Sequence, residues 1–237
     1  MEKRRKKSRP LRKPQLPREY VSKERQLKII ISKKGLARTV QNLVNRNKNS
    51  LFKKRHYVAI IKYITEYLAW YFGYKKKPYL FESTNKEGEA MLICRGRKGH
   101  YAIFYDYMQF KKVFGHLEFE GQEAYAMLLI AHEMRHYYQM RQLDSKNPCE
   151  PQERLDKWRI DDENPKYPGK DCTVFEFFMQ SMELDAELFA YVFVADKLGV
   201  TVSLDYIGKD YIKEMEKYYI ELFGETNEDI FPQNIEQ

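Results

Sequence analysis

The chain has 237 residues, enough for one domain, or for one domain with an appendage, around a sizeable hydrophobic core. It contains no apolar run long enough to cross a membrane, and its first residues are charged, so we expect neither a membrane span nor a signal peptide. Its three cysteines are scattered and lack Cys-x-x-Cys spacing, which argues against a disulfide framework or a thiolate zinc site and favours a cytoplasmic location.

Positive charge is concentrated in the first quarter of the sequence. The formal net charge is +8, yet residues 1–57 carry twenty Lys and Arg against three acids, a net of +17, and the remaining 180 residues carry a net of −9. The sequence therefore predicts a mildly acidic body with a strongly basic N-terminal segment. Residues 1–25 combine this charge with three prolines and few apolar side chains, so we expect them to form a disordered basic arm.

A helical region is expected from 26 to 75. Apolar residues recur at helical spacing over 36–45 and, more strongly, over about 53–72. The main domain is expected to follow at 76–224.

The sequence of the first half of the main domain predicts a β-hairpin and a long helix. Two strand-like stretches, 90–94 and 101–105, are joined by a basic, glycine-containing turn and predict an antiparallel hairpin. A long helix is expected over about 122–142. A polar, proline-containing excursion follows over 143–172, with one short helical piece near 153–158.

The sequence of the second half of the main domain predicts two more helices. One is expected over about 174–198 and should end at Gly199, because glycine commonly terminates a helix. Another is expected over about 203–223, before a polar tail at 225–237. This order of elements indicates an α+β fold that is mostly helical.

The sequence HEMRH at 132–136 is the strongest sign of chemistry. His132 and His136 lie four residues apart in the long helix, so both imidazoles project from one face and can bind one Zn²⁺ at about 2.0–2.1 Å. Glu133 follows round the helix, close enough to take a proton from a zinc-bound water. Residues 125–131 are nearly all apolar, which favours histidines at the bottom of a cleft over a chance match or a surface helix end.

A zinc site with two histidines needs a third protein ligand and an open position for water. The helix at 174–198 offers Glu183, Asp185 and Glu187. Glu183 is favoured, because the alanine three residues later lets two helices approach closely. Asp185 would be the ligand if the helix were rotated about its axis so that Asp185 faced the histidines. Glu187 shares the face of Glu183, and if it is not the ligand it supports a ligand histidine. A solvated acidic helix face is the alternative explanation.

HEMRH followed by a helical Glu-x-x-Ala resembles the gluzincin group of metallopeptidases, whose third ligand is a glutamate on a following helix. In that pattern a small residue follows the ligand glutamate by three positions and an acid often follows it by four, as Ala186 and Glu187 follow Glu183. The string ELDAELFA at 183–190 is also similar to the Glu-x-x-Ala-x-x-Phe-Ala string of ImmA/IrrE-type peptidases of phages and mobile elements. The resemblance covers about 101–198, and it departs from that pattern in the basic arm, the long loop at 143–172 and the lack of an obvious helix-turn-helix.

The resemblance implies a zinc-dependent metallopeptidase with a zincin-like domain at 76–224. His132, His136 and Glu183 are then the zinc ligands, and Glu133 is the general base for hydrolysis of a peptide bond. A small antiparallel sheet or hairpin is expected to pack on the helix that carries the ligands.

Substrate binding and oxyanion stabilisation are less closely specified. The strand at 101–105 is expected to hold an extended substrate as an added edge strand. An oxyanion needs a donor besides zinc. The sequence does not choose among three candidates for it: Tyr167, His116 and Tyr101. His56 and His100 are expected to be non-ligands, because each lies alone in a basic stretch.

The basic segment 1–57 suits an electrostatic partner, for which a phosphate backbone is the usual choice and a solubilising tail the alternative. Attachment to a membrane surface is disfavoured, because the arm lacks an apolar face and a lipidation motif. Two functions remain. One is a zinc peptidase that acts on a protein or peptide and is brought by its arm to a DNA-bound regulator. The other is a nucleic-acid-binding protein with a catalytically inactive zincin-like core. The presence of His132, His136 and Glu133 favours the enzyme.

Overall fold

The computed structural model describes residues 52–83, 90–96, 99–204, 207–208, 210–226 and 231. The predicted arm at 1–25 and the predicted helix at 36–45 lie outside these residues, as does most of the tail at 225–237. The described elements follow in the order α3 (Lys54–Tyr71), β1 (Tyr79–Glu82), β2 (Met91–Arg95), β3 (Tyr101–Tyr105), α4 (Tyr107–Phe114), α5 (Phe119–Leu143), α6 (Gln152–Glu163), α7 (Val174–Phe178), α8 (Ser181–Leu198) and α9 (Tyr211–Phe223).

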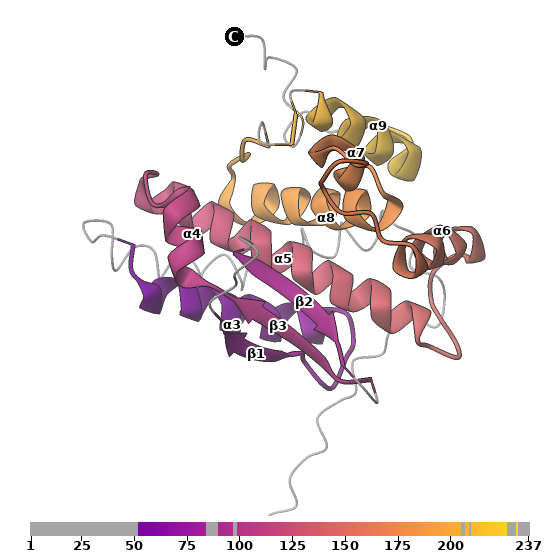
Figure 1. The fold of residues 1–237 in the computed structure, drawn as a ribbon, viewed down its shortest axis with the longest axis horizontal. Helices are drawn as coiled ribbons and strands as arrows, with labels where there is room; N and C mark the ends of the chain where they lie inside the picture. Colours follow the sequence, from indigo (N-terminus) through magenta and orange to yellow (C-terminus); the bar gives the residue numbers. More distant parts are fainter. Residues whose placement is uncertain are drawn as a thin grey trace, which may run out of the picture.

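The architecture is α+β and mostly helical, as the sequence predicts (Figure 1). Among the described helices, none combines the length and apolar character that a membrane crossing requires.

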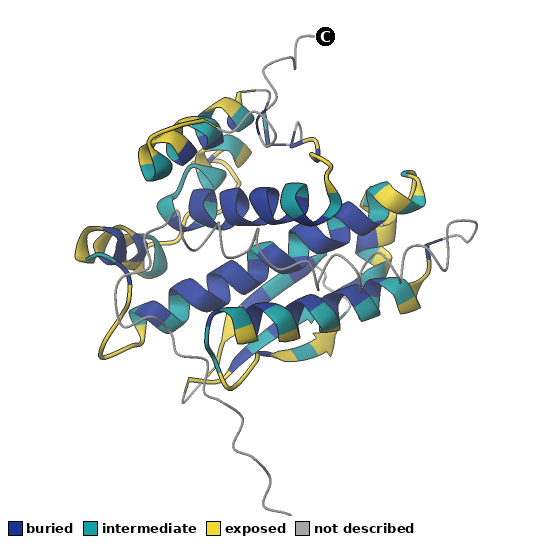
Figure 2. Ribbon diagram, turned by 180° about the vertical axis from the view of Figure 1, so that it is seen from behind, coloured by how far each residue is buried: buried dark blue, intermediate teal, exposed yellow. Residues whose placement is uncertain are grey.

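Helices α5 and α8 form the centre of the molecule. They lie side by side, and both are largely buried (Figures 1 and 2). Their sequences explain this position, because residues 126–131 of α5 and 186–194 of α8 are apolar on nearly every side of the helix apart from Glu187. α8 ends as predicted at Gly199, which has a φ of 67° and so adopts the left-handed conformation that glycine tolerates best.

The sheet has three strands in the order β1-β3-β2. β2 and β3 pair antiparallel, which confirms the predicted hairpin. β1 pairs parallel to β3, so the sheet is mixed, and the expectation of a purely antiparallel sheet is wrong. β1 escaped prediction because its four residues, preceded by Pro78, are too few to show an alternating pattern.

One face of the sheet packs against helices α3 and α5. The side chains of Tyr101, Ile103 and Tyr105 alternate inward along β3 and are buried there. Tyr57 of α3 lies edge-on to Tyr105, with ring centroids 6.2 Å apart, and its hydroxyl donates to the Ala90 carbonyl. Helix α3, which was predicted from 53–72, therefore belongs to the same core as the sheet and α5.

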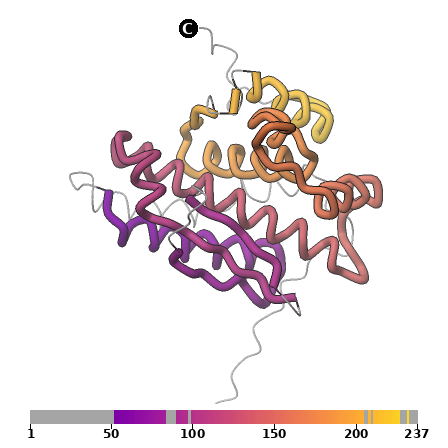
Figure 3. The backbone as a smooth tube through the Cα atoms, viewed as in Figure 1, coloured from indigo at the N-terminus to yellow at the C-terminus, as the bar shows by residue number. Residues whose placement is uncertain are grey.

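Helix α4 joins the sheet to the central helix and was not predicted. Its N-cap is Asp106, whose Oδ1 accepts hydrogen bonds from the backbone amides of Met108 and Gln109. The chain runs from β3 through α4 into α5 (Figure 3). Helix α4 therefore connects the central strand to the helix that carries the HEMRH sequence.

The expected helix at 174–198 is interrupted. α7 ends at Phe178, and α8 begins at Ser181 after an extended Gln180. The Gln180 side chain stabilises this break, because its Nε2 donates to the carbonyls of Lys166 and Phe177 while its Oε1 accepts from the Lys166 amide. The break starts α8 afresh just before Glu183.

The remaining helices differ from prediction in length. α6 extends over Gln152–Glu163, twice the short piece expected at 153–158. The helix expected over 203–223 is confirmed only from Tyr211 onward.

Candidate metal centre

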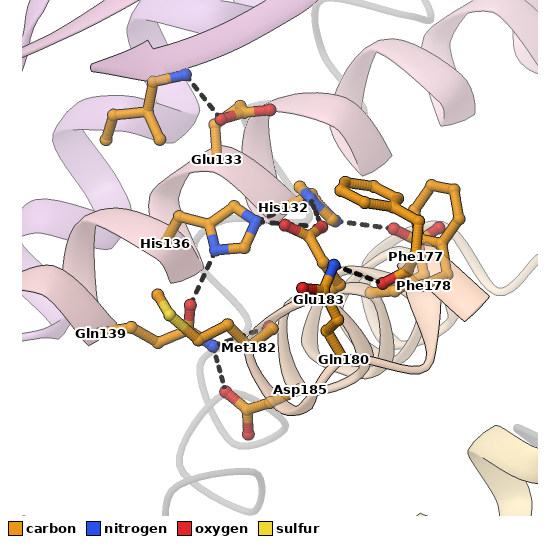
Figure 4. A network of polar contacts seen from close by, with 12 residues as sticks. His132, Glu133, His136, Gln139, Phe177, Phe178, Gln180, Met182, Glu183 and Asp185 are labelled. Carbon is orange, nitrogen blue, oxygen red and sulfur yellow. Dashed lines mark hydrogen bonds and ion pairs between the residues drawn. The ribbon is translucent and has the colours of Figure 1, made fainter. Parts of the chain in front are cut away.

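Helix α5 presents His132 and His136 toward α8, and α8 presents Glu183 toward them, while Glu133 points toward the sheet (Figure 4). The two Nε2 atoms of the histidines lie 3.0 Å apart. Glu183 Oε2 is 3.3 Å from each of them. One ligand atom from each of His132, His136 and Glu183 lies within 4.8 Å of the others, as a single metal ion requires.

Hydrogen bonds fix which imidazole nitrogen of each histidine faces the centre. Nδ1 of His132 is 2.7 Å from Glu187 Oε2, and Nδ1 of His136 is 2.7 Å from Gln139 Oε1. The Gln139 amide is itself oriented, because its Nε2 donates to the Met182 carbonyl and to Asp185 Oδ2 at 2.9 Å each. Each Nδ1 therefore carries a proton and donates it, which leaves the lone pair of each neutral imidazole on Nε2.

Two imidazole lone pairs and a carboxylate oxygen thus converge on one point. Such an arrangement repels itself unless a proton or a metal ion lies between the three groups. Two nitrogens bound to one tetrahedral Zn²⁺ lie about 3.3 Å apart, so the observed 3.0 Å requires a shift of a few tenths of an ångström. Two histidines and one glutamate are also ligand types that Zn²⁺ takes in catalytic sites. The residues present fit the ion.

The charges at the centre are strongly coupled. Burial lowers the pKa of His132, but its bonds to Glu183 and Glu187 outweigh this and raise the pKa well above its ordinary value. Burial opposes ionisation of Glu183, yet the charge of His136 and the hydrogen bonds from both histidines lower the pKa of Glu183 far below its usual range. Without a metal ion the cluster therefore retains a proton, and a metal ion would have to displace it.

Glu133 lies beside this cluster, buried between α5 and the sheet. Its Oε2 accepts a hydrogen bond of 2.8 Å from the Ile93 amide of β2, which fixes the orientation of the carboxylate. Burial raises the pKa of Glu133. The carboxylate is therefore held at the sheet edge and disposed to accept a proton.

The structure separates the three acids that the sequence offers as third ligand. Glu183 faces both histidines, and Glu187 bonds to His132, as expected of a supporting residue. Asp185 points to the opposite side, where Arg135 donates to its two oxygens at 2.8 and 3.2 Å. Burial would raise the pKa of Asp185, but the charge of Arg135 lowers it. Asp185 therefore belongs to an ion pair between α5 and α8.

Sequence reasoning missed Gln139 and Arg135. Gln139 follows His136 by three residues, a spacing that places the two side chains on one face of a helix and that was available as a signal. Arg135 has no such local signal, because its carboxylate partner comes from another helix fifty residues later.

A cavity of about 680 Å³ opens over the cluster, and His132, Glu133, His136 and Glu183 form part of its wall. β2, the end of α6, the loop at 165–167 and α7 form other parts. Its walls are mostly apolar. Among the apolar side chains are those of Leu92, Val113, Phe114, Leu117, Leu129, Met140, Phe177 and Phe178.

The strand predicted to hold a substrate is the wrong one. β3 is the central strand and pairs on both sides, so residues 101–105 offer no free edge. β2 pairs with β3 alone among the described strands, and its residues line the cavity.

Of the three oxyanion candidates, His116 and Tyr167 line the cavity. Tyr101 does not serve, because its ring is buried and its hydroxyl donates to Asp144 at the far end of α5. His56 and His100 lie outside the cluster that holds the ligand atoms.

Comparison of the chain with family models, with curated proteins and with solved structures finds no match. The functional assignment therefore depends on the geometry of the centre and on the residue pattern described above.

Proposed function

We propose that the chain is a zinc-dependent metallopeptidase that hydrolyses a peptide bond in a protein or peptide. The observation that carries the proposal is the convergence of His132 Nε2, His136 Nε2 and Glu183 Oε2 beside the buried carboxylate of Glu133. Zn²⁺ bound there would supply a Lewis acid that polarises a carbonyl and lowers the pKa of a bound water to about 7.

Glu133 is the general base in this proposal. Its carboxylate is oriented by the Ile93 amide, and its raised pKa suits a group that takes a proton from water and returns it to the leaving amine. His132 and His136 hold their Nε2 atoms toward the centre because Glu187 and Gln139 bind their Nδ1 atoms.

An extended peptide is the substrate that the surroundings favour. One edge of β2 pairs with β3, and the other edge borders the cavity. A free strand edge can pair with an added strand. The apolar walls suit the side chains of an unfolded segment. A catalytically inactive core gives no function to a buried Glu133 carboxylate beside the histidine cluster. The position of Glu133 therefore favours the enzyme over the alternative of a protein that only binds nucleic acid.

The proposal is tested by metal content and by hydrolysis. Purified wild type should carry one zinc per chain and cleave peptides from an unbiased mixture. Glu133→Gln should keep the zinc and lose about 10²–10⁴-fold in rate. Zinc in wild type with no difference in cleavage between wild type and Glu133→Gln would favour the inactive core. A wild type that holds no zinc would overturn the assignment.

A further inference from the structure

A row of aromatic rings, exposed except for the half-buried Phe104, lies on the face of the sheet opposite the core. Tyr79 and Phe81 project from the same side of β1 and are 57% and 49% exposed. Phe104, the register partner of Phe81 on β3, stacks on it at 5.6 Å with an interplanar angle of 25°. At the other end of the row, the Tyr79 ring lies 6.1 Å from that of His100. We call these four residues the aromatic face.

The core of the protein does not account for the aromatic face. The inward side of β3 is already filled by Tyr101, Ile103 and Tyr105. The outward rings are held next to one another without being covered, since Tyr79 and Phe81 lie 6.3 Å apart and are about half exposed. A contiguous group of exposed apolar rings marks an interaction site more often than isolated exposed side chains do.

The segments that build the aromatic face carry an excess of positive charge. Residues 73–82 and 90–105 contain six Lys and Arg and one acid, Glu82, which pairs with Lys54 of α3, although residues 58–237 as a whole carry a net charge of −9. The basic residues fall in two runs, Lys75–Lys77 before β1 and 95–98 between β2 and β3. Because β1 and β3 are parallel, the Lys75–Lys77 run and His100 adjoin the same end of the sheet, where the ring of Tyr79 lies beside that of His100.

Two of the six basic residues, Arg97 and Lys98, lie outside the described residues, and ion pairs occupy two of the other four. Lys77 pairs with Glu66, and Arg95 pairs with Asp162 at 3.0 Å. Lys75 and Lys76 are exposed and precede Tyr79 by four and three residues. The surface therefore joins flat apolar rings to positive charge.

We propose that the aromatic face binds single-stranded nucleic acid, with bases stacked on the rings and phosphates beside the Lys75–Lys77 run. Unpaired bases can stack on exposed aromatic side chains, whereas the bases of a duplex are already stacked on one another. An apolar protein partner would account for the rings but not for the excess of Lys and Arg in both segments. The site is separate from the candidate metal centre, and none of its residues belongs to the predicted basic arm at 1–25.

The test measures binding of a fluorescently labelled thymidine oligonucleotide of about 12 nucleotides to the full chain by anisotropy. The double variant Tyr79→Ala/Phe81→Ala should weaken binding by at least about tenfold, because stacking contributes measurably for each base. Trp70→Ala is the matched control, since Trp70 is 47% exposed but lies on α3, outside the aromatic face, and it should bind like wild type. Unchanged circular dichroism and melting temperature would show that the variants fold.

The basic run is tested by salt dependence. The triple variant Lys75→Gln/Lys76→Gln/Lys77→Gln should reduce the slope of log K against log salt by up to about 2, which corresponds to three phosphate contacts on a single strand. Unchanged affinity of Tyr79→Ala/Phe81→Ala would overturn the proposal, because the binding would then be purely electrostatic and attributable to the arm. Equal competition by a duplex or by polyglutamate would overturn it as well.

Discussion

The variant Arg135→Met probes the ion pair that lies behind the metal centre. Arg135 is 5% exposed and donates through Nε and a terminal nitrogen to Asp185. Its guanidinium carbon lies 4.6, 5.3 and 5.8 Å from the ring centroids of Tyr138, Phe189 and Trp158. Methionine has a similar length and suits this aromatic surrounding, so the substitution removes charge more than it removes packing.

The magnitude follows from what the variant leaves behind. Asp185 is 4% exposed, and without Arg135 the Gln139 amide would still donate to it and the charge of Arg154 would still act on it. Removal of one partner from a buried ion pair costs about 3–5 kcal/mol, because the other charge stays buried without its hydrogen-bonded partner. One kcal/mol shifts the melting temperature of a chain of this size by about 2–4 °C. We therefore expect Arg135→Met to melt roughly 6–20 °C below wild type.

Urea titration and calorimetry would measure this loss. Arg159→Met is the matched control, because Arg159 pairs with Asp156 at 2.9 Å on the surface, where side chains 47% and 54% exposed predict a loss of about 0–1 kcal/mol. Adding Asp185→Asn to Arg135→Met removes the unpaired carboxylate and should restore part of the stability. A loss in Arg135→Met no greater than that in Arg159→Met would refute the role of the buried pair.

Three further predictions concern the centre. Gln139→Leu should weaken zinc binding about 10–100-fold in a chelator competition, because His136 loses the acceptor that orients it; unchanged affinity would contradict this role. Zinc at about one hundred times its Kd should raise the free energy of unfolding of the metal-free protein by about 2.7 kcal/mol, and Glu183→Gln should lose most of this gain; equal stabilisation of both would argue against Glu183 as ligand. The lowered pKa of Asp185 means that below about pH 4 the unfolded chain binds more protons than the folded one, so the free energy of unfolding should fall as the pH falls through this range; a flat profile would contradict the ion pair.

The residues of the centre were predictable where helix geometry alone relates them. His132 and His136 are one turn apart on a single helix, and Glu183 and Glu187 are one turn apart on another, so each pair shares a face in any α-helix. Glu187 Oε2 lies 2.7 Å from His132 Nδ1, which is the contact expected of an acid four residues after Glu183. Which of Glu183 and Asp185 faces α5 depends on how α8 is rotated, and that is set by packing and by the Arg135 ion pair.

The errors in prediction arise where contacts are distant in sequence. β1 exists because residues 79–82 pair with β3 more than twenty residues later, and nothing in four residues indicates such a partner. The same pairing turned β3 into a central strand and removed the edge on which substrate binding was predicted. The break before α8 depends likewise on Gln180 binding Lys166 in the preceding loop.

The hydrogen bond from the Ile93 amide to Glu133 has a consequence for the register of a bound peptide. In a strand, amides that point toward one edge recur every second residue, so Met91, Ile93 and Arg95 share the edge of β2 that faces away from β3. Glu133 already occupies the middle one. A peptide that adds to this edge can therefore form rungs on either side of Ile93 but not at it. The gap lies beside the carboxylate proposed as general base, so in the proposed peptidase the ladder itself would align one segment of the peptide with Glu133 whatever the sequence of the peptide.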